Sequence, residues 1–170
     1  MSLRTIMIFP KFNNIEIIDN IRSQYDPLTK LVRPHITIVF PFESQMTNKE
    51  LTKILNMRLM SVKPFKLILG GISKHENTFG KYLFLDVLQG KEEICSIHQI
   101  LYNTDFKEFN LGLHYIPHIT IGKLSSVQLL NEAYNNIAYI NDTFSTTINK
   151  ISVEMIGDNE ESIIVIEKVL

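Results

Sequence analysis

The apolar positions in the first part of the chain switch between strand-like and helix-like spacing. Residues 4–9 are rich in Ile, Met and Phe and stop at Pro10, which indicates a buried strand. Residues 13–16 place a glutamate three positions after an asparagine, which predicts a capping box and a helix that ends before Pro27. The apolar run at residues 33–40 lies between prolines and predicts a second strand.

The next segment predicts a helix and then a pair of strands. Residues 47–50 form a second capping box, and the helix that follows has an apolar face of Leu51, Ile54, Leu55 and Leu59. Residues 65–72 and 82–88 read as two strands joined by a polar loop that contains glycine. We therefore expect a hairpin, with His75 exposed in its loop.

The second half of the chain follows the same order of elements. Ile94, Ile97 and Leu101 mark a helix, and a loop through residues 110–112 precedes a strand at residues 118–124. The expected elements after that strand are a helix capped at residues 125–128 and running through Leu130, Ala133 and Ile137, and strands near residues 145–155 and 162–169 around a turn at 157–159. The two halves therefore indicate a duplication that covers most of the chain.

One motif recurs at the centre of both halves. Pro-His-Ile-Thr-Ile occupies residues 34–38 and again residues 117–121, so that the two histidines are 83 positions apart in a chain of 170. A repeat at about half the chain length indicates a duplicated supersecondary unit. Side chains alternate between the two faces of a strand, so each histidine shares a face with the threonine two residues later. The isoleucines then face the core, and the His-Thr pairs can meet across a cleft.

That pairing suits acid-base chemistry on a phosphodiester. Histidine has an unperturbed pKa of about 6.5, so near neutral pH one imidazole can accept a proton while another donates one. Threonine hydroxyls can donate hydrogen bonds to phosphate oxygens. The sequence thus predicts His35 and His118 as catalytic residues and Thr37 and Thr120 as phosphate-binding residues. Which histidine is the acid stays open, because the two motifs are identical.

Four further side chains are candidates for substrate binding. Arg33 has the strand parity of His35, although Pro34 can bend the strand between them. Lys123 has the core parity, so it reaches the cleft only through a bulge or a strand end. Tyr82 and Phe84 share a strand face and could stack on a nucleobase, or could belong to the core.

The paired His-x-Thr motifs, each preceded by proline and followed by an aliphatic residue, resemble those of the two-histidine (2H) phosphoesterase superfamily, which includes 2'-5' RNA ligase-like proteins and cyclic phosphodiesterases. The resemblance covers nearly the whole chain and includes an early Tyr-Asp-Pro at residues 25–27. It implies a bilobal α+β fold in which two antiparallel sheets line a central cleft and helices pack outside. It also implies that His35 and His118 are the acid-base pair and that Thr37 and Thr120 bind phosphate. Many ligase-like members carry arginine shortly after the second motif, where this chain has Gly122-Lys123.

Composition limits the class of protein, its partners and its location. The hydrophobic fraction of 45% and the charged fraction of 21% are ordinary for a globular protein, and we expect residues 1–170 to form a single domain of two pseudo-symmetric lobes. A net charge of -1 argues against a long polyanion-binding surface and leaves a nucleotide or an RNA end as the partner. We expect a cytoplasmic monomer without membrane association, because there is one cysteine, Cys95, and no apolar run long enough to span a bilayer.

No cofactor is expected. The sequence has no Gly-x-x-x-x-Gly-Lys-[Ser/Thr] loop to hold a triphosphate, so ATP-driven ligation is unsupported. His114 and His118 have the spacing of a metal pair on a helix, but Pro117 disfavours that helix and no acidic cluster accompanies them. His98 and Cys95 have positions typical of packed helix residues.

The sequence therefore predicts a metal-independent phosphodiesterase that acts on a nucleotide or RNA-end phosphodiester, either a 2',3'-cyclic phosphate or a 2'-5' linkage. A non-catalytic nucleotide-binding or RNA-binding module that uses the same cleft is the main alternative. A related esterase with a non-nucleotide substrate is a third.

Overall fold

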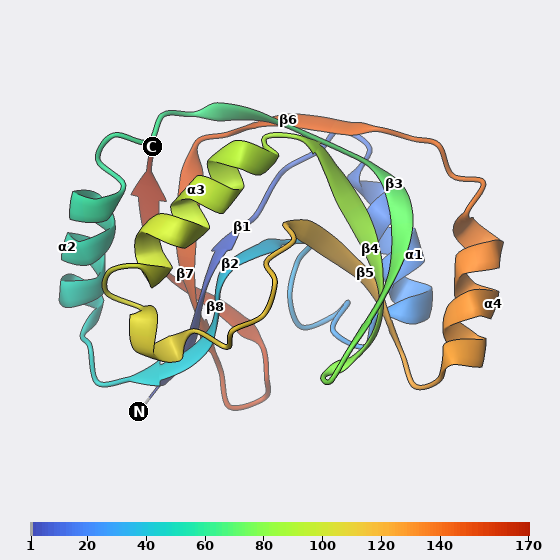
Figure 1. Ribbon diagram of the computed structural model, residues 1–170, viewed down its shortest axis with the longest axis horizontal. Helices are drawn as coiled ribbons and strands as arrows, with labels where there is room; N and C mark the ends of the chain where they lie inside the picture. Colours follow the sequence, from blue (N-terminus) through green and yellow to red (C-terminus); the bar gives the residue numbers. More distant parts are fainter. Residues whose placement is uncertain (1) are drawn as a thin grey trace.

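Two antiparallel sheets form the frame of the molecule (Figure 1). The computed structural model describes residues 2–170, and within this range each sheet has four strands. The first sheet has the order β2-β1-β7-β8, with bounds Ile36–Ser44, Ser2–Ile8, Lys150–Ile156 and Ser162–Val169. The second has the order β5-β4-β3-β6, with bounds His118–Leu124, Gly80–Gln89, Phe65–Asn77 and Phe144–Ile148. The predicted α+β fold class with two antiparallel sheets is confirmed.

The helices cross between the two sheets. The helix α1 (Ile15–Tyr25) connects β1 to β2 in the first sheet but packs on β5 of the second. The helix α3 (Lys91–Tyr102) connects β4 to β5 in the second sheet but packs on β2 of the first. The helix α2 (Asn48–Arg58) packs on β8 of the first sheet. The helix α4 (Val127–Ile137) packs on β3, β4 and β5 of the second sheet. Figure 1 accordingly shows α2 and α3 on one side and α1 and α4 on the other. Each sheet with its helices therefore draws on both halves of the sequence, which supports the expectation of one domain.

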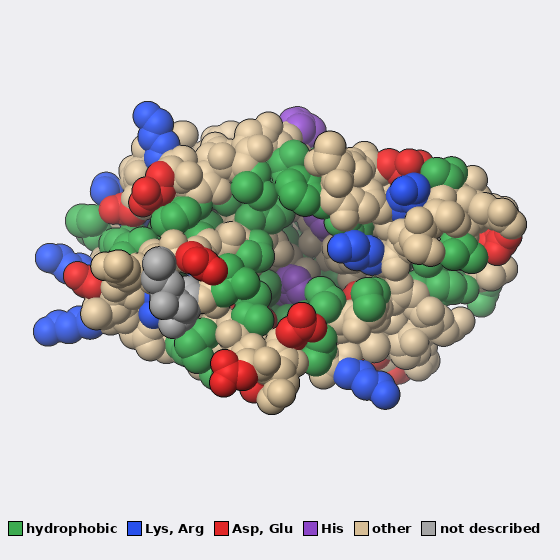
Figure 2. Space-filling view, turned by 90° about the horizontal axis from the view of Figure 1, so that it is seen from below, with side chains coloured by type: hydrophobic (Ala, Val, Ile, Leu, Met, Phe, Trp, Pro, Cys, Tyr) green, Lys and Arg blue, Asp and Glu red, His purple; other side chains and the backbone are tan. Residues whose placement is uncertain are grey.

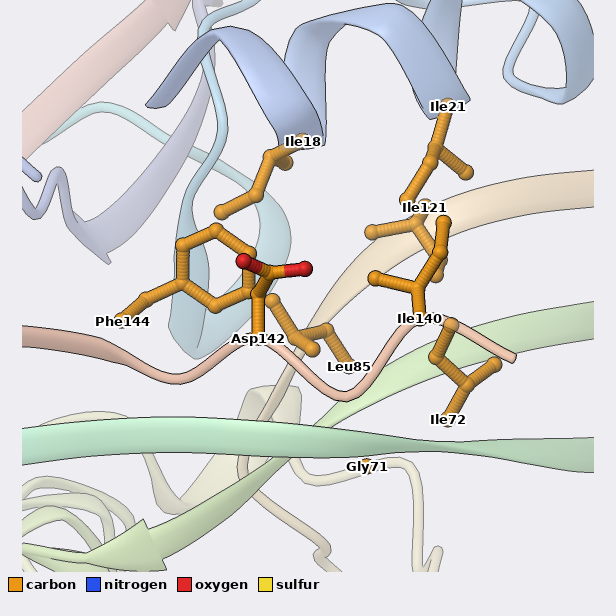
Figure 3. A pocket seen from close by; sticks show the side chains of 9 residues that line it. All are labelled: Ile18, Ile21, Gly71, Ile72, Leu85, Ile121, Ile140, Asp142 and Phe144. Atoms are coloured by element: carbon orange, nitrogen blue, oxygen red, sulfur yellow. The ribbon is translucent and has the colours of Figure 1, made fainter. Parts of the chain in front are cut away.

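The repeated motifs lie on the two edge strands β2 and β5, which come into contact with each other. The motif isoleucines, Ile36, Ile38, Ile119 and Ile121, are fully buried. Figure 3 shows how the second copy does this, because Ile18 and Ile21 of α1 point toward Ile121 over the second sheet. The prediction that the isoleucines face the helices is confirmed.

Two of the three expected helix caps differ from the prediction. The capping box of Thr47 and Glu50 is present, and each of the two residues accepts the other's backbone N–H. The first helix is capped at Asn14, whose side chain makes no capping bond and donates instead to the carbonyl of Thr143. The last helix is capped by the Ser126 hydroxyl, one residue later than expected. A tertiary contact therefore replaces the local cap at Asn14, whereas the cap at Ser126 stays local.

Three strand boundaries also differ. The strand β2 continues past Pro41 to Ser44, which an edge strand permits because a proline opposite a register shift leaves no ladder bond unmade. The strand β3 continues to Asn77 and therefore includes His75, which was expected in a loop. Residues 145–155, expected as one strand, contain parts of β6 and β7 in different sheets, with Asn149 between them.

No helix within residues 2–170 is both long and apolar enough to cross a bilayer.

A buried ion pair holds the segment that leads to the first motif. Arg22 and Asp26 are almost fully buried, with a distance of 2.7 Å between Nε and Oδ2. The other end of the guanidinium donates to the carbonyl of Val32 at 2.9 Å, and Asp26 accepts the N–H of Leu28. The Tyr-Asp-Pro at residues 25–27 therefore belongs to a network that fixes the turn before His35.

We expect Asp26→Ala to lower the free energy of unfolding by about 3–5 kcal/mol, because it leaves the buried Arg22 charge without its partner. Urea denaturation of both proteins measures the difference. The matched control is Glu167→Ala, which removes the half-exposed partner of Lys150 and is expected to cost less than about 1 kcal/mol. Equal losses in the two variants would contradict a structural role for the buried pair.

Candidate active site

The two motif histidines are anchored in the same way. His35 lies directly before β2, and its Nδ1 is 2.8 Å from the carbonyl oxygen of Arg33. His118 is the first residue of β5, and its Nδ1 is 2.5 Å from the carbonyl oxygen of Ile116. A carbonyl oxygen can only accept a hydrogen bond, so both Nδ1 atoms carry hydrogen. Each Nε2 is therefore left to accept a proton from, or donate one to, a bound group.

A cleft of about 620 Å³ lies between the two edge strands. The lining comes from β2, from the β3–β4 hairpin, from the loop before β5 and from β5 itself. Its residues are Thr37, Phe40, Pro41, His75, Glu76, Asn77, Phe79, Tyr82, Phe84, Leu111, Leu113, His114, Tyr115, Ile116, His118 and Thr120. Figure 2 shows histidine side chains inside a hollow of the surface. His35 is not part of this lining and precedes the lining residue Thr37 by two positions; a charge on His35 opposes a charge on His118 and so contributes to the lowered pKa of His118.

Burial keeps both imidazoles neutral over a wider pH range than usual. The pKa of His118 is lowered to about 4, mainly by burial and to a smaller extent by the neighbouring His75 and His35, against the opposing hydrogen bond to Ile116. Burial also lowers the pKa of His35, while its hydrogen bond to Arg33 acts in the other direction. At neutral pH the free site therefore holds two uncharged imidazoles, and an anionic ligand would favour a proton on one of them.

The loop before the second motif is joined to the first motif. The Tyr115 hydroxyl donates to the carbonyl of Thr37 at 2.7 Å. The ring of Tyr115 stacks on His98 with centroids 3.7 Å apart, and Nδ1 of His98 bonds to the carbonyl of Ile38. His98 is thus a packed helix residue, as predicted. Tyr115 was missed because a single tyrosine in an irregular loop gives no periodic signal.

Lys123 reaches the cleft side of its sheet through a bulge. Leu83 is opposite Gly122 and Phe84 is opposite Thr120, so Ile121 is the additional residue. The parity of the strand changes there, and Lys123 pairs with Tyr82. Its Nζ lies 5.7 Å from the centre of the Tyr82 ring. The bulge that the sequence required for this lysine is therefore present.

Arg33 lies apart from the cleft lining. Its side chain is exposed, and its guanidinium carbon lies 4.7 Å from the centre of the Phe9 ring. That ring is 6.0 Å from the His35 ring. The carbonyl of Arg33 contacts His35, whereas its guanidinium lines hollows with Phe9 and Lys11. A phosphate contact by Arg33 stays a prediction.

Tyr82 and Phe84 both line the cleft, on the same face of β4. Phe84 is buried, and its ring stacks on His118 with centroids 3.3 Å apart and an angle of 12° between the planes. His75 covers the ring from a centroid distance of 4.4 Å. The Phe84 ring is therefore already stacked on two imidazoles. Of Tyr82 and Phe84, Tyr82 is the better placed to stack on a ligand.

His75 is the main residue that sequence reasoning misplaced. It was expected to be exposed in a hairpin loop, but it lies in β3, half-buried and opposite Tyr82. The sequence did contain a sign of this strand, because Ser73, His75 and Asn77 are two positions apart and so share one strand face. The other face of this segment is also polar, so the alternation of apolar and polar residues that marks a strand was missing.

No group of three or more His, Cys, Asp or Glu side chains within the described part of the chain could hold a metal ion. His114 lines the cleft from the loop, and no helix joins it to His118.

Comparisons with known proteins identify the family of the chain. The family model described as the 2'-5' RNA ligase superfamily matches residues 10–158. A protein of Bacillus mycoides (strain KBAB4) that carries the name "Putative phosphoesterase" is 30% identical over 121 residues, which cover 69% of this chain and 67% of that protein. One from Geobacillus thermodenitrificans with the same name is 27% identical over 149 residues, covering 85% and 83% of the two chains.

Solved structures show the same fold. The apo structure of LigT from E. coli superposes with a TM-score of 0.65 at 14% identity and covers 99% of this chain and 97% of its own. LigT complexed with 3'-AMP gives a TM-score of 0.61 at 12% identity, with 99% and 98% covered. At these identities the likeness shows the fold alone. The family match spans most of the chain, and the protein belongs to the 2'-5' RNA ligase superfamily.

Proposed function

We propose that this protein is a metal-independent phosphodiesterase that acts on a nucleotide or RNA-end phosphodiester by acid-base catalysis with His35 and His118. One observation carries the proposal: two equivalent edge strands present two imidazoles with the same tautomer, each with its Nε2 free of the carbonyl that anchors the ring. A pair with one proton between them can deprotonate a nucleophile and protonate a leaving group.

The mechanism follows from that pair. The neutral histidine takes a proton from water through Nε2 as the water oxygen attacks phosphorus. The protonated histidine gives its proton to the leaving oxygen, so that a 2',3'-cyclic phosphate opens to a monoester or a 2'-5' linkage is cleaved. The hydroxyls of Thr37 and Thr120 would donate to non-bridging oxygens, and Lys123 would add positive charge at the cleft edge. One turnover exchanges the protonation states of the two histidines.

We assign His118 as the base and His35 as the acid. The pKa of His118, at about 4, leaves its imidazole unprotonated at neutral pH and able to accept a proton. Its stack on Phe84 also has no counterpart at His35, whose aromatic neighbour Phe9 is tilted and 6.0 Å away. A bound phosphodiester anion would raise the pKa of both groups, so that His35 can take up from solvent the proton that it must hold.

A nucleotide end suits the cleft. Its volume of about 620 Å³ is in the range of small-ligand pockets, and Tyr82, Phe79 and Leu111 form an apolar wall beside the polar motif residues. LigT, which shares the fold, has been solved with 3'-AMP and with ATP, so nucleotides are the first substrates to test. The single cysteine supports a cytoplasmic location for this reaction.

We expect hydrolysis of 2',3'-cyclic nucleotides or 2'-5'-linked dinucleotides in the presence of EDTA, and a loss of about 10²–10⁴-fold in kcat for His35→Ala and for His118→Ala. Steady-state assays over a panel of these substrates measure the effect. Lys74→Met, on the helix-covered face of β3, is the control that retains activity. Tight nucleotide binding without turnover in the wild-type protein would instead favour the binding module.

The pH profile of kcat/KM should be bell-shaped with its maximum on the acidic side of pH 6.5. Activity falls at low pH as the base His118 becomes protonated near its pKa of about 4, and falls at higher pH as the acid His35 loses its proton at a pKa below 6.5. Rates measured in buffers of constant ionic strength test this. A maximum above pH 7 would contradict the assignment.

A further inference from the structure

The rings of His118, Phe84 and His75 form a stack. The Phe84 ring lies between His118, at 3.3 Å and 12°, and His75, at 4.4 Å and 21°. The three residues come from the three adjacent strands β5, β4 and β3. The orientation of the His118 ring therefore depends on Phe84, and Phe84 is covered on its other side by a second imidazole.

That second imidazole is fixed by a chain of hydrogen bonds. The Ser73 hydroxyl donates its one hydrogen to Oδ1 of Asp86 at 2.7 Å. The contact of 3.0 Å between the same hydroxyl and Nε2 of His75 then requires the hydrogen to be on Nε2. His75 thus has the opposite tautomer to His35 and His118.

The strand register shows that this arrangement belongs to the cleft. Ser73 is opposite Phe84, and Asp86 is opposite His118, so the chain and the stack share one sheet face. Packing alone would be served by apolar side chains. The hydrogen bonds from Asp86 through Ser73 hold the titratable ring of His75 against Phe84, on which His118 also stacks.

We infer that His75 is a positioning residue for His118: through Phe84 it holds the His118 imidazole in its working orientation, and Ser73 and Asp86 fix His75 for this task. The inference deepens the proposed function and rests on it. The charge of a protonated His75 also opposes a charge on His118, which keeps His118 in the neutral form that a base needs.

Other charged and titratable groups share this surrounding and must be considered in any pH measurement. They are Tyr82 and Asp86 on β4, Lys123 on β5, Glu76 on β3, His114 and Tyr115 on the loop before β5, and His35 before β2. All of them stay in place in a variant that changes His75 alone.

The test is the titration of His118 by NMR of ¹⁵N-labelled histidine side chains, with His118→Ala used to assign its signals. His75→Phe keeps a ring against Phe84 but removes the charge and the bond to Ser73. We expect the pKa of His118 to rise by about 0.5 pH unit or more, because a positive neighbour is lost. Ser73→Ala, which leaves both rings, should shift it in the same direction by less.

Lys74→Met is the matched control. It removes a positive charge from the adjacent position of β3, but its side chain faces Asn131 and Tyr134 of α4. The pKa of His118 should not change in this variant. Unchanged His118 titration in both His75→Phe and Ser73→Ala would overturn the inference.

Kinetics distinguish this inference from the proposed function. With an active substrate, His75→Phe should lower kcat about ten-fold with little change in KM, and should move the acid limb of the pH profile upward with the NMR pKa. An acid limb that stays in place would count against positioning. If the wild-type protein hydrolyses no phosphodiester, the proposed function fails, while the titration still decides whether His75 controls His118.

Discussion

The pleat of the two edge strands β2 and β5 is the constraint on which the rest of the molecule depends. Alternation along each strand sends Ile36 and Ile38, or Ile119 and Ile121, into the helix-covered core. The same alternation leaves Thr37 and Thr120 on the opposite side, where they line the cleft. A shift of one residue in either register would bury the hydroxyls and expose the isoleucines. The core therefore fixes the site, because any strand slip that spoils one spoils the other.

The repeated motif carried the family resemblance that implied the fold class, and its strand parity predicted which motif residues face the core and which face the cleft. Isoleucine on one face and His-Thr on the other is a local property, and local properties can be read from sequence. The position of Lys123 needed a bulge at Ile121, which depends on pairing with β4 and could only be named as a requirement. His75 was placed in a loop because Ser73, Lys74 and Glu76 make the strand polar on both faces. The division of residues 145–155 between two sheets depends on which neighbours each part finds, and no local pattern records that.

The two copies of the motif share their backbone anchoring but differ in their surroundings. His35 has Phe9 at a tilt and the buried Arg22–Asp26 pair nearby, whereas His118 is stacked on Phe84. Identical five-residue sequences therefore lie in unlike environments, and different neighbours lower the pKa of each histidine. Symmetry in the sequence becomes asymmetry in the chemistry through residues outside the repeat. An acid and a base need that difference.

The crossing of α1 and α3 between the sheets bears on how such a molecule could arise. A single half of this chain would carry a helix whose main partner strand belongs to the other half, so its apolar face would be uncovered. Two identical halves could cover each other only as an intertwined pair with an exchanged helix. Such a pair would have two equal histidines at its axis and no means of making one differ from the other. Joining the halves in one chain removes that equality, since Phe9 and Phe84 can then change independently. In this fold, covalent linkage is what permits the two motif histidines to have different surroundings.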